Sequence, residues 1–243
     1  MDDYTSATYG NKGADLYDDI YPSQPSAAQL DLLAELVQGG RALELGIGTG
    51  RLAIPLVARG VAVEGLDSSE AMVSKMHAKD VGSSIPVTIS SFERFDLNKS
   101  FDLIFVAFNT IFSLLTQDAQ VSCFESVTRH LSPSGVFLVE AFVPDLSRFD
   151  HSQRTSVSHI EINRTIIDTA MHSLATQRVD SQHIVIEDGQ PARVMPVSLR
   201  YSWPAELDLM ARLAGLRLRN RWADWDRSPF GDHSDKHVSI WSR

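Results

Sequence analysis

The sequence of 243 residues contains a single cysteine, Cys123, which excludes an intrachain disulfide framework and any multi-cysteine metal site. Its 22 basic residues are outnumbered by 31 acidic ones, so the net charge of −9 leaves no basic excess to bind a nucleic-acid backbone. No run reaches the ~18 consecutive apolar residues of a membrane span. The first ten residues lack the basic flank and apolar core of a signal peptide. We therefore expect a cytoplasmic protein that binds neither nucleic acid nor a membrane.

Metal-binding spacing is also missing. None of the eight histidines pairs with another at helical spacing beside carboxylates. His233 and His237 are four residues apart, but Pro229, Gly231 and Asp235 indicate that His233 lies in a loop. No metal site is predicted.

Between residues 41 and 142, apolar runs alternate with amphipathic segments. The runs predict buried strands at 41–45, 61–67, 86–89, 101–108 and 136–142. Helices are predicted before and between them: from Pro25 to Gly39, over 51–58, from Ser68 or Ser69 through Met76, and from Val121 to Ser134. This alternation predicts an α/β fold with a Rossmann-like, doubly wound, mostly parallel sheet.

After Pro144 the pattern changes to successive β-type segments. Asp188-Gly189 is typical of a hairpin turn, and Pro204 suits the first turn of a helix. We predict one domain, 1–243, made of four parts. They are an N-terminal lid segment (1–24), a cofactor-binding core (25–146), an antiparallel β insertion (147–203), and a closing helix with the last two strands (204–243). If the chain forms a homo-oligomer, we expect it to associate through the insertion.

The most informative segment follows the first predicted strand. Glu44-Leu45-Gly46-Ile47-Gly48-Thr49-Gly50 is rich in glycines, which let the backbone turn sharply and let a ligand approach it closely. A dinucleotide fingerprint, G-x-G-x-x-G, would need its third glycine at position 51, where Arg51 stands. Asp67 ends the next strand, where a carboxylate can accept hydrogen bonds from both ribose hydroxyls. Together these features predict a nucleoside-containing cofactor.

This arrangement resembles the class I S-adenosylmethionine-dependent methyltransferases over about residues 41–145. Glu44 to Gly50 is similar to the first motif of the family, Val63 to Met72 to its ribose-binding strand and helix, and Phe101 to Asn109 to its fourth strand. The resemblance implies that S-adenosylmethionine is the cofactor and S-adenosylhomocysteine the product. The cofactor-binding residues it implies, together with our own additions, are Tyr17, Glu44, Gly46, Gly48, Gly50, Asp67, Ser68, Met72, Ser91, Phe92 and Phe108.

One departure from the family lies after the third strand. Many relatives carry an acidic residue there that contacts the adenine amino group, whereas this chain has Ser90-Ser91-Phe92. We expect backbone groups and packing by Phe92 to hold the adenine instead.

A narrower resemblance is to small-molecule N-methyltransferases of bacterial antibiotic pathways, of the amino-sugar or lincosamide type. A tyrosine-rich N-terminal segment, an inserted β-layer and the ending Trp225 to Phe230 are similar. The resemblance implies methyl transfer to an amine nitrogen of a small natural product, with the insertion over the acceptor pocket. An O-methyltransferase, an NAD-dependent oxidoreductase and a non-catalytic cofactor-binding protein remain the alternatives.

Three tyrosines, Tyr9, Tyr17 and Tyr21, precede the first core helix and suit either a lid over the cofactor mouth or ordinary packing of an N-terminal arm. A preactivated methyl group needs positioning and exclusion of water more than one essential base. We therefore predict that Tyr9 and Tyr17 act at the reacting centre chiefly by positioning, and that Tyr9 and Tyr21 contact the acceptor.

Further acceptor contacts are predicted where the fourth and fifth strands end. Ligands of open α/β sheets bind at the carboxyl ends of the strands, which points to Asn109, Phe112 and Phe142. Glu140 lies in an apolar run and therefore needs a polar partner. The sequence leaves open whether Glu140 faces the site or is satisfied by a partner in the core. His130 is expected on the surface of its helix.

Overall fold

The computed structural model describes residues 1, 3–21 and 24–243. Its central sheet has seven strands in the order β3-β2-β1-β4-β5-β11-β10. The strands are β1 (Arg41–Leu45), β2 (Ala62–Asp67), β3 (Val87–Ile89), β4 (Phe101–Val106), β5 (Leu131–Phe142), β10 (Arg217–Trp222) and β11 (Lys236–Ser242). Strands β1 to β5 pair in parallel, and β11 and β10 add an antiparallel edge beside β5. The predicted Rossmann-like, mostly parallel sheet is confirmed.

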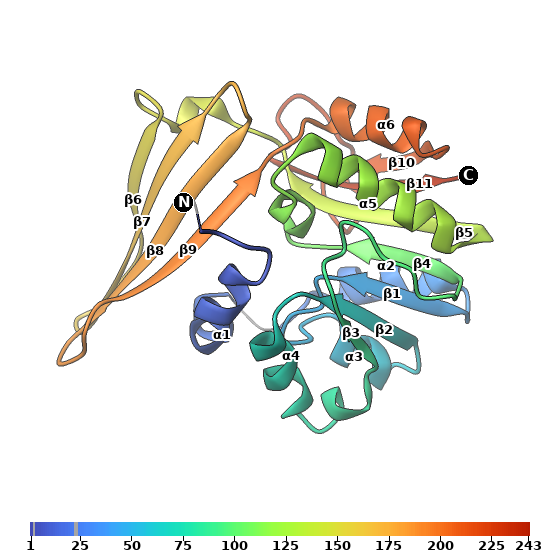
Figure 1. Cartoon of the computed structure of the whole chain (residues 1–243), viewed down its shortest axis with the longest axis horizontal. Helices are drawn as coiled ribbons and strands as arrows, with labels where there is room; N and C mark the ends of the chain where they lie inside the picture. The colour runs from blue at the N-terminus through green and yellow to red at the C-terminus, as the bar shows by residue number, and fades with distance from the viewer. Residues whose placement is uncertain (2, 22–23) are drawn as a thin grey trace.

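Helices cover both faces of this sheet (Figure 1). They are α2 (Ala27–Val37), α3 (Ala53–Ala58), α4 (Glu70–His77), α5 (Gln117–His130) and α6 (Pro204–Leu213), with short 3-10 turns η1 (Gly82–Ser84), η2 (Thr110–Ser113) and η3 (Leu146–Arg148). One core cluster joins α5 and α6 to one face, and a second joins α2, α3 and α4 to the other. Parallel strands need such cover because both faces of the sheet are apolar.

Local sequence signals explain where the helices begin. Ser26 caps α2 with a full capping box, in which Gln29 bonds back to the Ser26 N–H. Ser69, one of the two serines that the sequence offers, caps α4 by accepting from the Met72 N–H. Pro204 occupies the first turn of α6.

The insertion forms a separate four-stranded antiparallel sheet of β6 (Gln153–Ile160), β7 (Arg164–Ser173), β8 (Arg178–Glu187) and β9 (Arg193–Arg200). Gly189 adopts φ +70° in the predicted hairpin turn between β8 and β9. Figure 1 shows this sheet standing beside the carboxyl ends of the central strands, with the N-terminal helix between the two.

That helix, α1 (Thr8–Ile20), was not predicted within the N-terminal segment. Two glycines inside it, Gly10 and Gly13, lower its intrinsic propensity. Packing explains both, because a Cβ on Gly10 would lie 2.4 Å from that of Ser69, and one on Gly13 would lie 2.4 Å from the Met195 sulfur. Tertiary contact on both sides of the helix therefore outweighs local preference.

Three other expectations need correction. Helix α5 ends at His130 and not at Ser134, because β5 begins at Leu131. Strand β4 ends at Val106, since Phe108 and Asn109 turn the chain with positive φ. His130 is buried, not on the surface: its Nε2 accepts from the Leu97 N–H and its Nδ1 lies 2.7 Å from the Ser126 carbonyl oxygen.

The described residues contain neither a membrane-spanning helix nor a metal-binding cluster. No helix in residues 1, 3–21 and 24–243 has the length and apolar character to cross a membrane. The same residues contain no group of three or more side chains that could hold a metal ion.

Candidate active site

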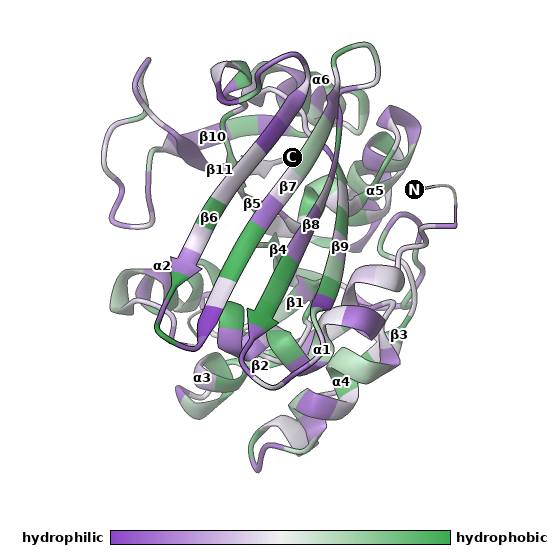
Figure 2. Ribbon diagram, turned by 90° about the vertical axis from the view of Figure 1, so that its left-hand side faces the viewer, coloured by the Kyte–Doolittle hydropathy of each residue, from purple (hydrophilic) through white to green (hydrophobic). Residues whose placement is uncertain are grey.

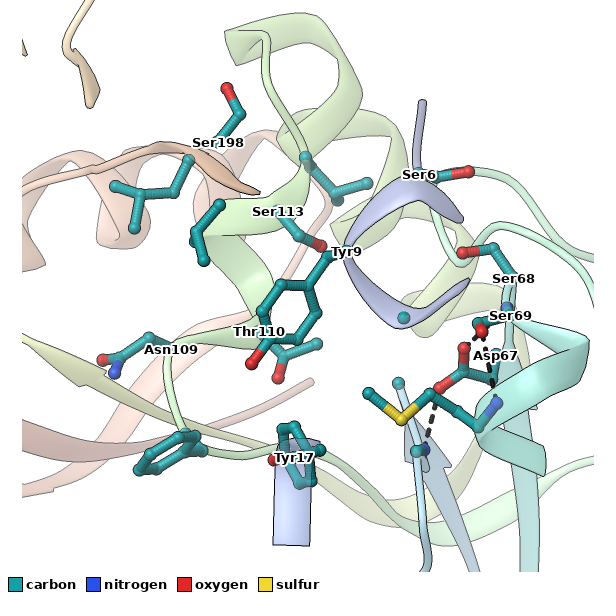
Figure 3. Close-up of a pocket in the computed structure, with 18 of the residues that line it drawn as sticks. Ser6, Tyr9, Tyr17, Asp67, Ser68, Ser69, Asn109, Thr110, Ser113 and Ser198 are labelled. Carbon is teal, nitrogen blue, oxygen red and sulfur yellow. Dashed lines mark hydrogen bonds between the residues drawn. The ribbon is translucent and has the colours of Figure 1, made fainter. Parts of the chain in front are cut away.

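A cavity of about 340 Å³ opens at the carboxyl ends of β1, β2 and β4. The loops after these strands form its floor, and α1 and β9 form further walls (Figure 3). Strand β8 also lines the cavity. The structure brings twelve of the predicted site residues to this cavity: Tyr9, Tyr17, Tyr21, Gly46, Gly48, Asp67, Ser68, Met72, Ser91, Phe92, Phe108 and Asn109. A crevice at this edge is where open α/β sheets bind their ligands.

Asp67 is held in place at the end of β2. Its two carboxylate oxygens each accept a backbone hydrogen bond of 2.8 Å, one from Gly48 and one from Ser69, as the dashed lines in Figure 3 mark. Burial raises the pKa of Asp67, and these backbone donors counteract that rise. Each oxygen retains acceptor capacity toward the cavity, so the carboxylate can still bind a pair of hydroxyl groups.

The glycine loop adopts the backbone conformation that its sequence indicates. Gly46 and Gly48 both have positive φ, +73° and +57°, which side-chain-bearing residues rarely adopt. Gly50, at φ +80°, does not line the cavity. A Cβ at this position would lie 2.6 Å from the Met76 Cγ and 2.9 Å from the Ile54 Cδ1, so the loop requires a glycine here.

Glu44 also lies behind the cavity wall. It is buried, and its Oε2 has no hydrogen-bond partner within the described part of the chain. Burial raises the pKa of Glu44 to about 8, and the neighbouring Arg51 limits that rise. A buried carboxyl group with a free acceptor atom favours a cationic or donor group nearby.

Four aromatic rings line the cavity in a continuous cluster. The centroids of Tyr9 and Tyr17 are 6.2 Å apart, those of Tyr17 and Tyr21 are 5.1 Å apart, and Tyr21 meets Phe108 edge-on at 5.1 Å. Burial raises the pKa of Tyr17 to about 12 and that of Tyr9 well above its usual value. Both phenols therefore stay protonated at neutral pH and present polar tips on apolar walls.

The turn after β4 is fixed by Glu140, which answers the question the sequence left open. Its Oε2 accepts from the Phe108 N–H at 2.8 Å and its Oε1 from the Trp225 indole N–H at 2.6 Å. The Asn109 amide oxygen accepts from the Phe142 N–H at 2.7 Å, so this side chain also braces the turn. Glu140 thus has structural partners that hold Phe108 and Asn109 at the cavity.

Phe112 and Phe142 differ from their predicted placement. Phe112 is fully buried in the core and lines neither this cavity nor the one beside it, contrary to the expectation that it contacts the acceptor. Its ring packs edge-on against that of Phe142, with the two ring centroids 4.9 Å apart. Phe142 lines a second cavity of about 1110 Å³, which shares Phe108, Asn109 and Leu199 with the first.

Sequence reasoning placed the insertion over the acceptor pocket but did not identify which of its side chains line the site. His183 and Ser181 on β8, and Val197, Ser198 and Leu199 on β9, line the first cavity. Strand alternation could identify which of these side chains share a face, but not which face meets the cavity, because that depends on where α1 packs.

A glycine loop after β1, a carboxylate after β2 and a roofed cavity between them define a Rossmann-like enzyme that binds a nucleoside-containing cofactor. The methyltransferase domain family matches residues 42–135. The CcbJ methyltransferase from Streptomyces caelestis has 36% sequence identity and a TM-score of 0.91, with 98% of both chains covered. The chain belongs to the S-adenosylmethionine-dependent methyltransferases.

Two further proteins are similar. The cypemycin N-terminal methyltransferase from Streptomyces sp is 22% identical over 208 residues, which cover 85% of this chain and 84% of the relative. The structure of CalS10 with bound S-adenosylmethionine, an amino pentose methyltransferase from Micromonospora echinaspora, has a TM-score of 0.69 at 20% identity. The alignment covers 94% of this chain and 96% of the CalS10 chain, so the two proteins share the fold.

S-adenosylmethionine is therefore the cofactor, and it supplies an electrophilic methyl group that leaves S-adenosylhomocysteine behind. The site fits this molecule: Asp67 lines the cavity and is fixed by two backbone hydrogen bonds, and the buried carboxyl group of Glu44 on the adjacent strand has an unpartnered oxygen. The chain is an enzyme, so the alternatives of an oxidoreductase and of a non-catalytic binding protein are set aside.

Proposed function

We propose that the enzyme transfers the methyl group of S-adenosylmethionine to an amine nitrogen of a small natural product. The observation that carries this proposal is the aromatic cluster of Tyr9, Tyr17, Tyr21 and Phe108 at the cavity. An amine becomes a cation as it accepts a methyl group, and aromatic faces stabilise cations without donating a proton. The name of the cypemycin N-terminal methyltransferase supports the same kind of acceptor.

For the cofactor, the proposed roles follow the chemistry of the walls. Asp67 binds the ribose hydroxyls, Met72 and Phe92 pack beside the adenine, and Gly46 and Gly48 let the methionine part lie against the loop. Tyr17, Ser68 and Ser91 complete this part of the cavity.

For the acceptor, we assign the parts of the cavity nearer the insertion. Tyr9 and Tyr21 border the reacting amine, and the second cavity, with Phe142, takes the bulk of the molecule. A volume of about 1110 Å³ beside the site favours an acceptor larger than a free amino acid.

The experiment is a panel of matched acceptors with S-adenosylmethionine, followed by mass spectrometry and NMR of the products. The amines are an aminopentose glycoside, a short peptide with a free N-terminus and a cyclic secondary amine, and each is paired with an analogue that carries a hydroxyl at the same atom. We expect methylation on nitrogen only. Methylation of the hydroxyl analogues alone would establish the O-methyltransferase alternative.

We also propose that two copies associate through the outer face of the insertion sheet, which Figure 2 shows toward the viewer. Val157, Ile167, Ile184 and Val194 are successive cross-strand partners and form one apolar row on that face. A two-fold axis through the row would set it against itself. Sedimentation velocity should find a dimer that Ile184→Lys converts to a monomer; a monomeric wild-type protein would contradict this.

A further inference from the structure

Three side chains from two parts of the fold form a hydrogen-bonded chain at the cavity. Asp168 on β7 and His183 on β8 are cross-strand partners, and the Asp168 Oδ1 lies 2.5 Å from the His183 Nδ1. The His183 Nε2 lies 2.9 Å from the hydroxyl of Tyr21, the residue that ends α1. These hydrogen bonds therefore join the insertion to the N-terminal helix.

The chemistry of the partners fixes the direction of these hydrogen bonds. An ionised carboxylate only accepts, so the His183 Nδ1 donates to Asp168, and the Nε2 lone pair is left to accept from the Tyr21 hydroxyl. Burial raises the pKa of Tyr21, so the phenol holds its proton at neutral pH and can pass one on without acting as a base itself. A neutral imidazole whose Nε2 accepts from a phenol can take the proton of that phenol.

The three hydrogen-bonded side chains also lie between two cavities. Tyr21 and His183 line the cofactor cavity, and together with Asp168 they line a further cavity of about 390 Å³ on the other side. The Asp168 and His183 side chains are 28% and 19% exposed, so a proton that reaches them has a route to solvent. A proton released beside Tyr21 would otherwise remain in a cavity walled by aromatic rings.

We propose that Tyr21, His183 and Asp168 relay the proton that the acceptor loses during methylation. The acceptor lone pair forms the new bond to the methyl carbon, and the electron pair of the broken carbon–sulfur bond returns to sulfur. The methylated acceptor then gives its proton to the Tyr21 oxygen while the Tyr21 proton moves to the His183 Nε2. The Asp168 carboxylate stabilises the resulting imidazolium until it releases its proton to solvent.

In this relay Tyr21 touches the acceptor and is the catalytic residue, whereas His183 and Asp168 are positioning residues that act through it. The inference rests on the proposed acceptor only in requiring an atom that loses a proton, which nitrogen and oxygen both satisfy. The other titratable and charged groups that face the chain, from α1, from β6 and the turn after it, and from β7, are Tyr9, Tyr17, Asp19, His159, Glu161 and Arg164.

The kinetic test replaces His183 and Tyr21 and follows kcat and KM against pH with the best amine of the acceptor panel. His183→Gln can still bond to Tyr21 but cannot take its proton, and Tyr21→Phe removes the first carrier. General acid–base contributions of this kind predict a loss of about a hundredfold in kcat, with acceptor KM unchanged within about threefold. The acidic limb of the wild-type kcat profile should disappear in His183→Gln.

The matched control is His151→Gln, just ahead of β6, where an exposed histidine pairs with Asp150 at 2.6 Å and lies outside the relay. It should keep wild-type kcat and pH dependence. The relay is wrong if His183→Gln keeps the wild-type kcat and acidic limb, or if its loss lies in acceptor KM alone. Product analysis in the same assays shows separately whether nitrogen or oxygen is methylated.

A second readout needs no turnover and decides the matter even if a variant folds poorly. Nitrogen-15 NMR of the wild-type protein labelled at histidine reports which ring nitrogen of His183 carries the proton. The relay requires a proton on Nδ1 and a bare Nε2 at neutral pH. The opposite tautomer, with Nε2 donating to Tyr21, would overturn it.

Discussion

At the scale of single residues, the site depends on carboxylates whose surroundings give them different tasks. Asp67 accepts hydrogen bonds from two backbone donors at the cavity, whereas Glu44 is buried behind it with an unpartnered oxygen. Glu140 is wholly occupied with the Phe108 amide and the Trp225 indole. Of these three acids, on β2, β1 and β5, the first can bind a ligand, the second lies buried behind the site and the third holds the turn after β4.

The first prediction concerns Asp67. Asp67→Asn keeps the size of the side chain but loses the charge and half of its acceptor capacity. Charge-assisted hydrogen bonds are worth about 1.5–3 kcal/mol each, so losing one should weaken cofactor binding by about tenfold or more. Isothermal titration with S-adenosylhomocysteine measures this. Glu64→Gln, on the same strand and in a surface ion pair with Lys99, is the control; equal affinities in all three proteins would remove Asp67 from the site.

The second prediction concerns the pH dependence that Glu44 confers. Its pKa is about 8 in the folded protein and near 4.5 when unfolded, so between these values the folded state holds the extra proton. The free energy of unfolding should therefore fall as pH rises through this window, by up to about 1.4 kcal/mol per pH unit. Urea titrations without cofactor at pH 5 to 8 should find a shallower fall for Glu44→Gln. Parallel curves for the two proteins would contradict the prediction.

At the scale of elements, the loops carry the site and α1 closes it. Helix α1 packs on the insertion through Leu16, which meets Ile166 and Val185. It packs on α4 through Gly10, and the Asn11 amide oxygen accepts from the Ser69 hydroxyl. The helix therefore links the insertion to the strand end that holds Asp67.

The third prediction tests that link. A methyl group at position 10 would lie 2.4 Å from the Ser69 Cβ, so Gly10→Ala must push α1 away from α4. A displacement of ~1 Å at the reacting centre can cost about a hundredfold in rate. We expect kcat/KM to fall by about that factor, while Lys12→Ala, on the exposed side of the same helix, keeps wild-type activity. Unaltered kinetics in Gly10→Ala would mean that α1 does not position the reactants.

The elements differ in how well the sequence predicts them. The core strands, the helix starts at Ser26, Ser69 and Pro204 and the hairpin at Gly189 depend on local signals, and they lie where those signals indicate. Helix α1 depends on packing between distant segments, and the Asp168–His183 pair depends on the register of β7 with β8; no local pattern reports either. The glycine loop and Asp67 could be found from spacing alone, whereas the walls from the insertion could not.

At the scale of the whole molecule, the cofactor cavity is built from three parts of the fold. The central sheet supplies the glycine loop and Asp67, α1 supplies the tyrosines, and the insertion supplies His183 and its neighbours (Figure 1). A ligand that fills this cavity would contact all three parts. Its binding should therefore stabilise the folded molecule beyond the loops that it touches directly.

The last prediction measures this coupling with S-adenosylhomocysteine. At 100 times its dissociation constant a ligand adds about 2.7 kcal/mol to the free energy of unfolding. For a chain of this length that corresponds to a rise of about 5–10 °C in Tm. NADH should leave Tm unchanged, because the loop spacing 46-48-50 is not that of a dinucleotide site. Hydrogen exchange should slow in α1 and along β8 and β9 as well as in the loops after β1 and β2. If protection stayed within those two loops, α1 and the insertion would not close over the cofactor, and the Tm rise would come from the central sheet alone.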